Sequence, residues 1–116
     1  MLFRSRILAD VPCSASGVAR RHPDIKWLRR ESDLSQFAAS QQEILDALWQ
    51  TLARDGKLLY ATCSVFAEEN KLQVAKFLRH HPDARSLPCS GMEAIDGQLL
   101  PDSQHDGFFY TLLHKA

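Results

Sequence analysis

Two cysteines are the residues of this sequence that are best placed to do chemistry. Cys13 and Cys63 each follow a short apolar stretch that favours a β-strand, and each is followed by a serine. Short, nearly continuous apolar runs are typical of buried strands in parallel sheets. Open α/β sheets bind their ligands beyond the carboxyl ends of such strands. We therefore expect both thiols to lie at one edge of a parallel sheet, where a substrate would bind.

A cysteine pair of this kind suits nucleophilic chemistry on a ring. A thiolate can add to an electron-poor ring carbon. One thiol could therefore attack while the other handles proton transfer or release of the adduct. Asp10, at the end of the first apolar stretch, could hydrogen-bond a heterocyclic base. A single cysteine is more often a small buried apolar residue, but the paired placement favours the chemical interpretation.

The composition indicates one small domain without a metal site. The chain has 116 residues with ordinary apolar and charged fractions, enough for a modest core. Its three cysteines, which include Cys89, form no C-x-x-C pair, and its five histidines show no ligand spacing. This pattern argues against a disulfide framework and against zinc. No apolar run approaches the ~20 residues of a membrane span, so we expect a cytoplasmic protein that contacts no membrane.

The strand pattern predicts an α/β fold. Strands are expected over residues 5–10 and 57–62, and weaker signals cover 85–87, 98–100 and 108–113. The first two strands are separated by a helix, so they are expected to be parallel and joined by a crossover. The last strand follows the Asp106-Gly107 turn and is expected to pair antiparallel with its neighbour.

The helix signals are stronger than the later strand signals. One helix is expected from Asp33, as its N-cap, to the Asp55-Gly56 pair, with Gly56 as a left-handed C-cap. A second helix is expected over 67–80, with Glu68 and Glu69 in its first turn and its positive end favouring the Cys63 thiolate. A short helix is also expected over 22–28.

Positive charge is concentrated near the amino terminus. The first 30 residues hold seven basic and two acidic residues, although the whole chain has no net charge. A basic segment beside a reactive site suits a polyanion such as RNA. A solvated loop and helix would show the same charge, so this alternative stays open.

Several motifs resemble those of the Nol1/Nop2/Sun (Fmu) family of RNA 5-methylcytosine methyltransferases. Residues 10–17, Asp-Val-Pro-Cys-Ser-Ala-Ser-Gly, resemble the family's D-[AV]-P-C-S-[AG]-[ST]-G motif. Residues 60–64, Tyr-Ala-Thr-Cys-Ser, resemble its Y-[AS]-T-C-S motif. Further matches follow the family's order at 20–27, 68–70 and 106–110. The resemblance covers nearly the whole chain and is closest to the bacterial members that modify small-subunit ribosomal RNA.

The resemblance implies a role for each residue of the site. Cys63 would be the nucleophile that adds to C6 of cytosine, Cys13 would assist release of the product, and Asp10 would steady the base. S-adenosylmethionine would be the methyl donor and ribosomal RNA the substrate. The residues implied in substrate binding are Pro12, Ser14, Arg20, Arg21 and Lys26, and those at a possible rim of the cofactor site are Asp10 and Pro12.

One family motif has no counterpart in the sequence. The family's glycine-rich cofactor loop is missing, because the five glycines form no cluster. We therefore expect residues 1–116 to form a single partial catalytic domain, the carboxyl-terminal half of a Rossmann-like methyltransferase fold without the amino-terminal cofactor-binding strands. Such a fragment would be inactive alone, and it could form a homo-oligomer through the exposed edge of strand 5–10.

Two alternatives to this hypothesis remain open. The chain could be a non-catalytic RNA-binding module in which the cysteines are vestigial, and a lowered pKa of Cys63 would argue against this. It could also be an unrelated thiol hydrolase, in which one of His80, His81 and His105 would have to approach Cys63.

Overall fold

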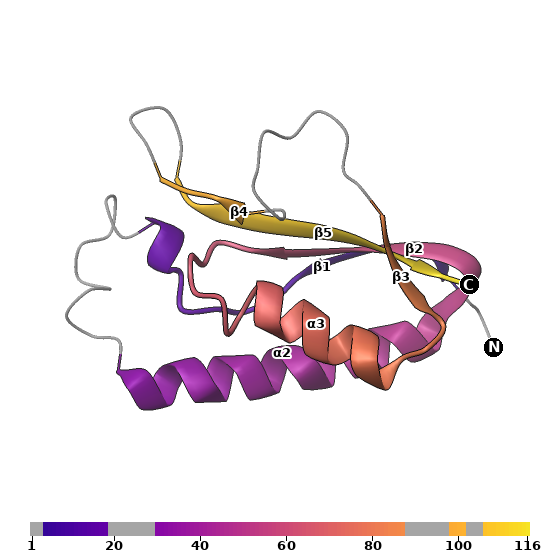
Figure 1. The fold of residues 1–116 in the computed structure, drawn as a ribbon, viewed down its shortest axis with the longest axis horizontal. Coiled ribbons are helices and arrows are strands. Elements are labelled where there is room, and N and C mark those ends of the chain that lie inside the picture. Colours follow the sequence, from indigo (N-terminus) through magenta and orange to yellow (C-terminus); the bar gives the residue numbers. More distant parts are fainter. Residues whose placement is uncertain (1–3, 19–29, 88–97, 102–105) are drawn as a thin grey trace.

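The computed structural model describes residues 4–18, 30–87, 98–101 and 106–116 (Figure 1). The elements in chain order are β1 (Arg4–Asp10), a single 3-10 turn η1 (Ser16–Val18), α2 (Glu31–Thr51), β2 (Leu52–Thr62), α3 (Lys71–His80), β3 (Ala84–Leu87), β4 (Gln98–Leu99) and β5 (Phe108–Lys115). Both helices lie on the same side of the sheet, so the described residues form two layers (Figure 1).

The sheet confirms the predicted α/β fold class. Its strand order is β1-β2-β5-β3, with β4 paired to β5. β1 and β2 are parallel and are connected through α2, as the sequence predicts, and β5 is antiparallel to β2, β3 and β4. Each weak strand signal corresponds to an observed strand, within two residues at either end. The parallel pair brings the carboxyl ends of β1 and β2 to the same edge of the sheet.

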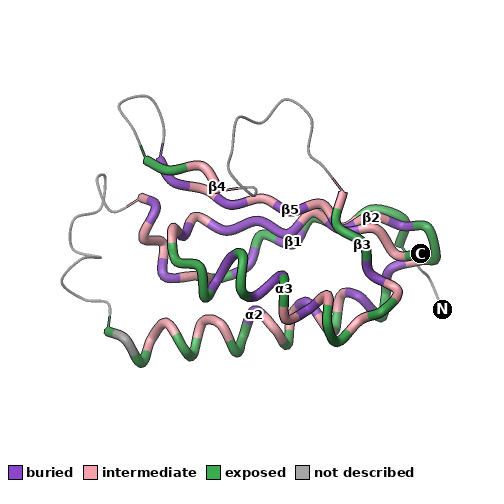
Figure 2. Tube along the Cα trace, viewed as in Figure 1, coloured by how far each residue is buried: buried purple, intermediate pink, exposed green. Residues whose placement is uncertain are grey.

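The core lies between the sheet and the two helices. Leu58, Tyr60 and Leu113 from β2 and β5 are fully buried on the helix-facing side of the sheet. Trp49 of α2 and Phe77 of α3 pack edge to face, with ring centroids 5.1 Å apart. Figure 2 shows the buried residues along the sheet and along the inner sides of the helices. Burial of these aromatic side chains stabilises the two-layer arrangement, because each removes a large apolar area from water.

The other face of the sheet is apolar and more exposed. Leu8, Leu59 and Leu112 lie side by side across β1, β2 and β5, and Leu8 is 67% exposed. Among the described residues, β1 pairs only with β2, so its other edge keeps free backbone donors and acceptors. Such an edge can pair with another chain. Self-association through β1 therefore stays a prediction.

The predicted limits of the first helix are wrong at both ends. Arg30 is the N-cap, and Asp33 lies three residues inside, where its carboxylate accepts the Arg30 backbone N–H at 2.9 Å. At the other end α2 stops at Thr51, and β2 begins at once with Leu52. Asp55, not Gly56, has the positive φ, at 66°. The apolar residues before Gly56 pack as a strand, which overrides their helical spacing.

The predicted start of the second helix is also wrong. α3 begins at Lys71, and residues 67–70 form turns in which Asn70 N–H donates to the Ala67 carbonyl at 3.1 Å. No acidic residue lies in its first turn. Glu69 is instead fully buried. The helix ends at His80, as predicted.

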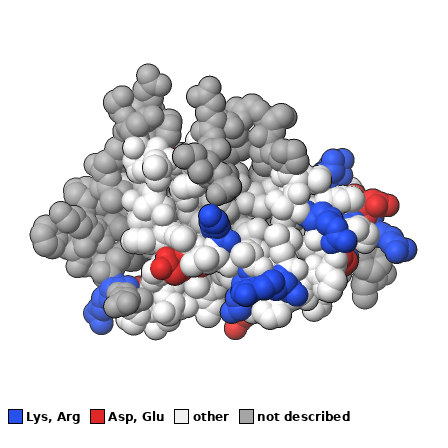
Figure 3. Space-filling model, in the orientation of Figure 1, with Lys and Arg blue, Asp and Glu red and all other residues white. Residues whose placement is uncertain are grey.

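Several features predicted or noted from the sequence lie outside the described residues. They are the short helix over 22–28, the basic residues Arg20, Arg21 and Lys26, and the third cysteine, Cys89. On the face that Figure 3 shows, Lys and Arg side chains gather along one margin and one end, and the middle is mainly uncharged. Within the described part of the chain, no helix has the length and apolar character of a membrane span.

Candidate active site

The two predicted cysteines meet where β1 and β2 end. The parallel pairing places Asp10 beside Ala61, and the Val11 N–H continues it by donating to the Ala61 carbonyl at 3.2 Å. Each chain then turns into its cysteine loop. The sulfur atoms of Cys13 and Cys63 lie 3.4 Å apart, and both residues are half-buried. The geometry inferred from the two strand ends is therefore correct.

Backbone contacts hold the two cysteine loops together. Gly17 N–H donates to the Cys63 carbonyl at 2.8 Å, and the Gly17 carbonyl accepts the Gly107 N–H at 2.7 Å. Ala15 has a φ of 60°, in the left-handed region that alanine seldom adopts. This turn brings the chain after Cys13 back against the Cys63 loop. The loops thus fix the distance between the thiols through main-chain atoms.

The two thiols differ in their readiness to ionise. A hydrogen bond from Cys13 to the Cys63 sulfur lowers the pKa of Cys63 to about 7, against the raising effects of partial burial and of the negative charges of Asp10 and Glu69. The same hydrogen bond, together with burial, raises the pKa of Cys13. Cys63 is therefore the thiol of the pair that ionises more readily, and Cys13 is the thiol that holds its proton. The predicted contribution of a following helix does not apply, because α3 begins only at Lys71.

The pKa of Cys63 leads to a direct prediction for thiol chemistry. A lowered pKa means that the thiolate forms as the pH rises through about 7, and the thiolate is the reactive form. The rate of Cys63 alkylation by iodoacetamide should therefore reach half its plateau near pH 7, while Cys13 should react slowly over the same range. Mass spectrometry of peptides after timed alkylation measures both rates. A midpoint for Cys63 above pH 8.5, the range of an ordinary thiol, would contradict the prediction.

The buried carboxylate of Glu69, which the sequence pattern placed in the first turn of a helix, bonds to the residue that follows each cysteine. Glu69 is 0% exposed, and its two oxygens accept hydrogen bonds from Ser14, Gln41 and Ser64. We call these four residues the Glu69 network. The resemblance included Glu69 in a motif but gave no reason for it. The only other signal was Gln41, the one polar residue on an otherwise apolar helix face.

A second set of buried polar groups supports this network. Gln41 donates to the Pro12 carbonyl at 2.8 Å, and its carbonyl oxygen accepts the Tyr60 hydroxyl at 3.2 Å. Burial raises the pKa of Tyr60, so its hydroxyl remains a donor, and it also donates to the Glu69 backbone carbonyl. Among the described residues, every buried side-chain polar atom has a partner. The polar groups below the thiols are therefore held in one arrangement.

The remaining predicted site residues have different surroundings. Asp10 and Pro12 are exposed at the edge of the sheet. Ser14 is buried, with its hydroxyl and its N–H both bonded to Glu69. Contact of these three residues with a substrate stays a prediction, as does that of the basic residues outside the described part.

The thiol hydrolase alternative finds no support in the histidines that the structure describes. His81 bonds to Asp46 at 2.9 Å and stacks on Phe77. His80 is exposed at the carboxyl end of α3. Neither is among the charged or hydrogen-bonding groups that affect Cys63. His105 lies outside the described residues.

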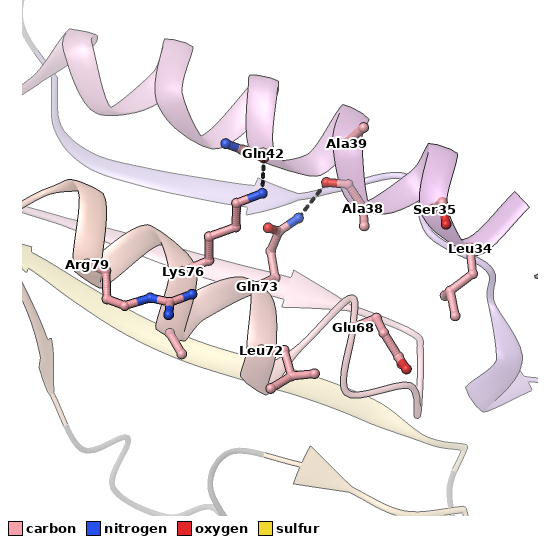
Figure 4. Close-up of a pocket in the computed structure, with 11 residues that line it drawn as sticks. Leu34, Ser35, Ala38, Ala39, Gln42, Glu68, Leu72, Gln73, Lys76 and Arg79 are labelled. Atoms are coloured by element: carbon pink, nitrogen blue, oxygen red, sulfur yellow. Dashed lines mark hydrogen bonds between the residues drawn. The ribbon is translucent and has the colours of Figure 1, made fainter. Parts of the chain in front are cut away.

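A groove between the helices is separate from the thiols. It has a volume of about 810 Å³ and lies between α2 and α3, which are bridged by Lys76 donating to Gln42 at 2.8 Å and Gln73 donating to the Ala38 carbonyl at 2.6 Å (Figure 4). Neither cysteine lines it. In the described part of the chain, no three His, Cys, Asp or Glu side chains are grouped to hold a metal ion.

The fold and the cysteine pair define a part of an α/β methyltransferase. The structure of a methyltransferase homologue from Pyrococcus horikoshii superposes with a TM-score of 0.82 and 26% identity, over 99% of this chain and 40% of that one. NSun6 from Pyrococcus horikoshii, solved with the S-adenosylmethionine analogue SFG, gives a TM-score of 0.85 and 27% identity over 98% of this chain and 30% of its own.

The sequence comparisons identify the family. The family model described as 16S rRNA methyltransferase RsmB/F matches residues 2–114, so the chain belongs to this family. Ribosomal RNA small subunit methyltransferase B of Erwinia tasmaniensis is 52% identical over 111 residues, and that of Photorhabdus laumondii is 50% identical over 111 residues. The match covers 95% of this chain but only 26% of each relative. The chain thus corresponds to a part of the catalytic domain.

Proposed function

We propose that this chain supplies the cytosine-side residues of an S-adenosylmethionine-dependent ribosomal RNA cytosine-C5 methyltransferase. The observation that carries the proposal is the thiol pair: two sulfur atoms 3.4 Å apart at the carboxyl ends of parallel strands. The lowered pKa of Cys63 favours this function over an RNA-binding module with vestigial cysteines. A vestigial thiol would have no need of a partner that keeps it ionised.

In the proposed reaction Cys63 is the nucleophile. Its thiolate adds to C6 of the cytosine, and the electron pair moves to C5, which becomes able to accept a methyl group. S-adenosylmethionine, when bound, would supply that methyl group and leave as S-adenosylhomocysteine. Transfer of the C5 proton to water then expels the Cys63 thiolate and restores the ring. Cys13 assists this last step, because its thiol can donate a hydrogen bond to the leaving sulfur.

Asp10 is proposed to steady the base. It is exposed at the end of β1, beside the half-buried thiols. A carboxylate there can accept hydrogen bonds from the polar edge of a cytosine that has left its stack. Pro12 is exposed and lies between Asp10 and Cys13 in the sequence. Asp10 and Pro12 are therefore proposed to line the rim of the base and cofactor sites. Contacts with the phosphates of the RNA are assigned to Arg20, Arg21 and Lys26.

We infer that the described residues do not form a complete cofactor site. The inference rests on the glycines of the chain, which form no cluster that could make a glycine-rich cofactor loop. We therefore propose that this chain alone does not turn over S-adenosylmethionine. Ribosomal RNA as substrate, together with free thiols, suits the bacterial cytoplasm.

The proposal is tested by covalent trapping on RNA. A segment of 16S ribosomal RNA containing 5-azacytidine is incubated with this chain and, in parallel, with a chimera in which the chain replaces the matching segment of the Erwinia tasmaniensis relative. We expect a denaturant-resistant adduct that mass spectrometry maps to Cys63, and methyl transfer from labelled S-adenosylmethionine to unmodified RNA only by the chimera. Methyl transfer by the chain alone would contradict the proposed inactivity. A chimera that gives neither product would contradict the proposed function.

A further inference from the structure

Glu69 accepts hydrogen bonds from both cysteine loops. One carboxylate oxygen accepts the Ser14 hydroxyl at 2.5 Å and the Ser64 hydroxyl at 2.7 Å. The other accepts the Ser14 backbone N–H at 2.9 Å and the Gln41 side-chain N–H at 2.9 Å. Ser14 directly follows Cys13, and Ser64 directly follows Cys63. A single side chain thus bonds to the residue next to each thiol.

Each of the four contacts around Glu69 ends on its carboxylate. All four are donated to it, two to each oxygen. A glutamine could keep all four, because a serine hydroxyl also accepts and could take an amide N–H. An alanine would remove all four. Such a buried network is stable only when every member is satisfied, so removal of the carboxylate should release Ser14 and Ser64 from each other.

We propose that Glu69 is a positioning residue that holds the Cys13 and Cys63 sulfur atoms within hydrogen-bond distance of each other. The proposal concerns the thiol pair of this chain, and its consequence for methylation rests on the proposed function. Glu69 acts through Ser14 and Ser64, so it needs no contact with the RNA base. It also connects the pair to α2 through Gln41.

The pH dependence of Cys63 separates positioning from simple charge. The groups that face Cys63 are the Cys13 thiol and the carboxylates of Asp10 and Glu69. As a charge, Glu69 raises the pKa of Cys63, so removing the charge alone would lower that pKa. As a positioning residue, Glu69 maintains the Cys13 hydrogen bond that lowers the pKa of Cys63, so removing it would raise that pKa. The two interpretations therefore predict opposite signs.

The test is the alkylation profile of the Glu69→Ala variant of the full chain, with Glu68→Ala as the matched control. Glu68 is the exposed neighbour and lies outside the network. We expect the Cys63 midpoint to move upward from about 7 in Glu69→Ala and to stay in place in Glu68→Ala. At pH 7 the rate of Cys63 alkylation should fall by roughly five- to fifty-fold, as the thiolate fraction decreases. Circular dichroism verifies that each variant is folded.

An unchanged or lowered midpoint in a folded Glu69→Ala variant would overturn the proposal. If that variant does not fold, Ser64→Ala replaces it, because it removes one link to the carboxylate and leaves Glu69 in place. A rise in the midpoint then supports the proposal, and no rise contradicts it. The measurement uses no RNA and no cofactor. A failure of the proposed methylation would therefore leave this result unaffected, and the reverse also holds.

Discussion

Replacing Cys63 by alanine in the chimera is expected to abolish both methyl transfer and the trapped adduct. The residue is the only nucleophile assigned to C6 of the cytosine, and removing a nucleophile lowers turnover by about four orders of magnitude or more. Replacing Cys13 by alanine is expected to stop turnover as well, but to leave a stable protein–RNA adduct on Cys63. The two variants thus lose activity for different reasons, and the adduct on a denaturing gel distinguishes them.

Cys89→Ala is the matched control for these two variants. It removes the third thiol of the chain, to which no role is assigned, and should retain both turnover and the response to 5-azacytidine. The reverse result, an adduct in Cys63→Ala and none in Cys13→Ala, would exchange the roles of the two cysteines. The difference in their pKa values argues against that exchange, because Cys13 holds its proton while Cys63 loses it near pH 7.

The sequence predicts the fold well where one physical pattern dominates. The apolar runs before Asp10 and Cys63 form the strands β1 and β2, and the helix between them makes the strands parallel. The burial expected from the first run is wrong, because most residues of β1 are exposed. That topology brings the two thiols to the same edge of the sheet. The final strand was also predictable, because the Asp106-Gly107 turn precedes a run of aromatic, Thr and Leu residues over 108–113.

The sequence fails where residues distant along the chain decide a local structure. Glu69 has the composition of a helix first turn, yet it is buried because Ser14, 55 residues earlier, donates to it. Leu52 continues the helical spacing, but pairing with Arg4 makes it the first residue of β2. Propensity is a weak prior that tertiary contacts override. Both errors therefore occur at contacts between segments.

Gly17 shows a further requirement that the spacing of residues does not reveal. Gly17 is the last residue of the motif at 10–17, and the structure shows a close approach of three main-chain segments there. A Cβ at position 17 would overlap the Gly107 carbonyl oxygen and would lie 2.7 Å from the Cys63 carbonyl oxygen. The Cys63 carbonyl also accepts the Gly17 N–H, and the Gly107 N–H donates to the Gly17 carbonyl. The absence of a side chain is therefore what allows the two cysteine loops to meet.

Replacing Gly17 by alanine should consequently separate the loops. We expect a loss of about 1–3 kcal/mol from the overlap and about 1 kcal/mol for each weakened backbone hydrogen bond, which lowers Tm by about 10 °C or more for a domain of this size. Because the Cys13 sulfur moves away from Cys63, the midpoint of Cys63 alkylation should also rise from about 7.

Gly56→Ala is the control that separates these two effects. A Cβ there would also lie 2.7 Å from a backbone oxygen, that of Ala53, but at the start of β2 and away from the thiols. We expect it to lower Tm and to leave the Cys63 alkylation midpoint in place. Equal shifts of the midpoint in both variants would mean that the pKa of Cys63 depends on the general stability of the fold. A shift in Gly17→Ala alone would mean that this pKa depends on the contact between the two cysteine loops.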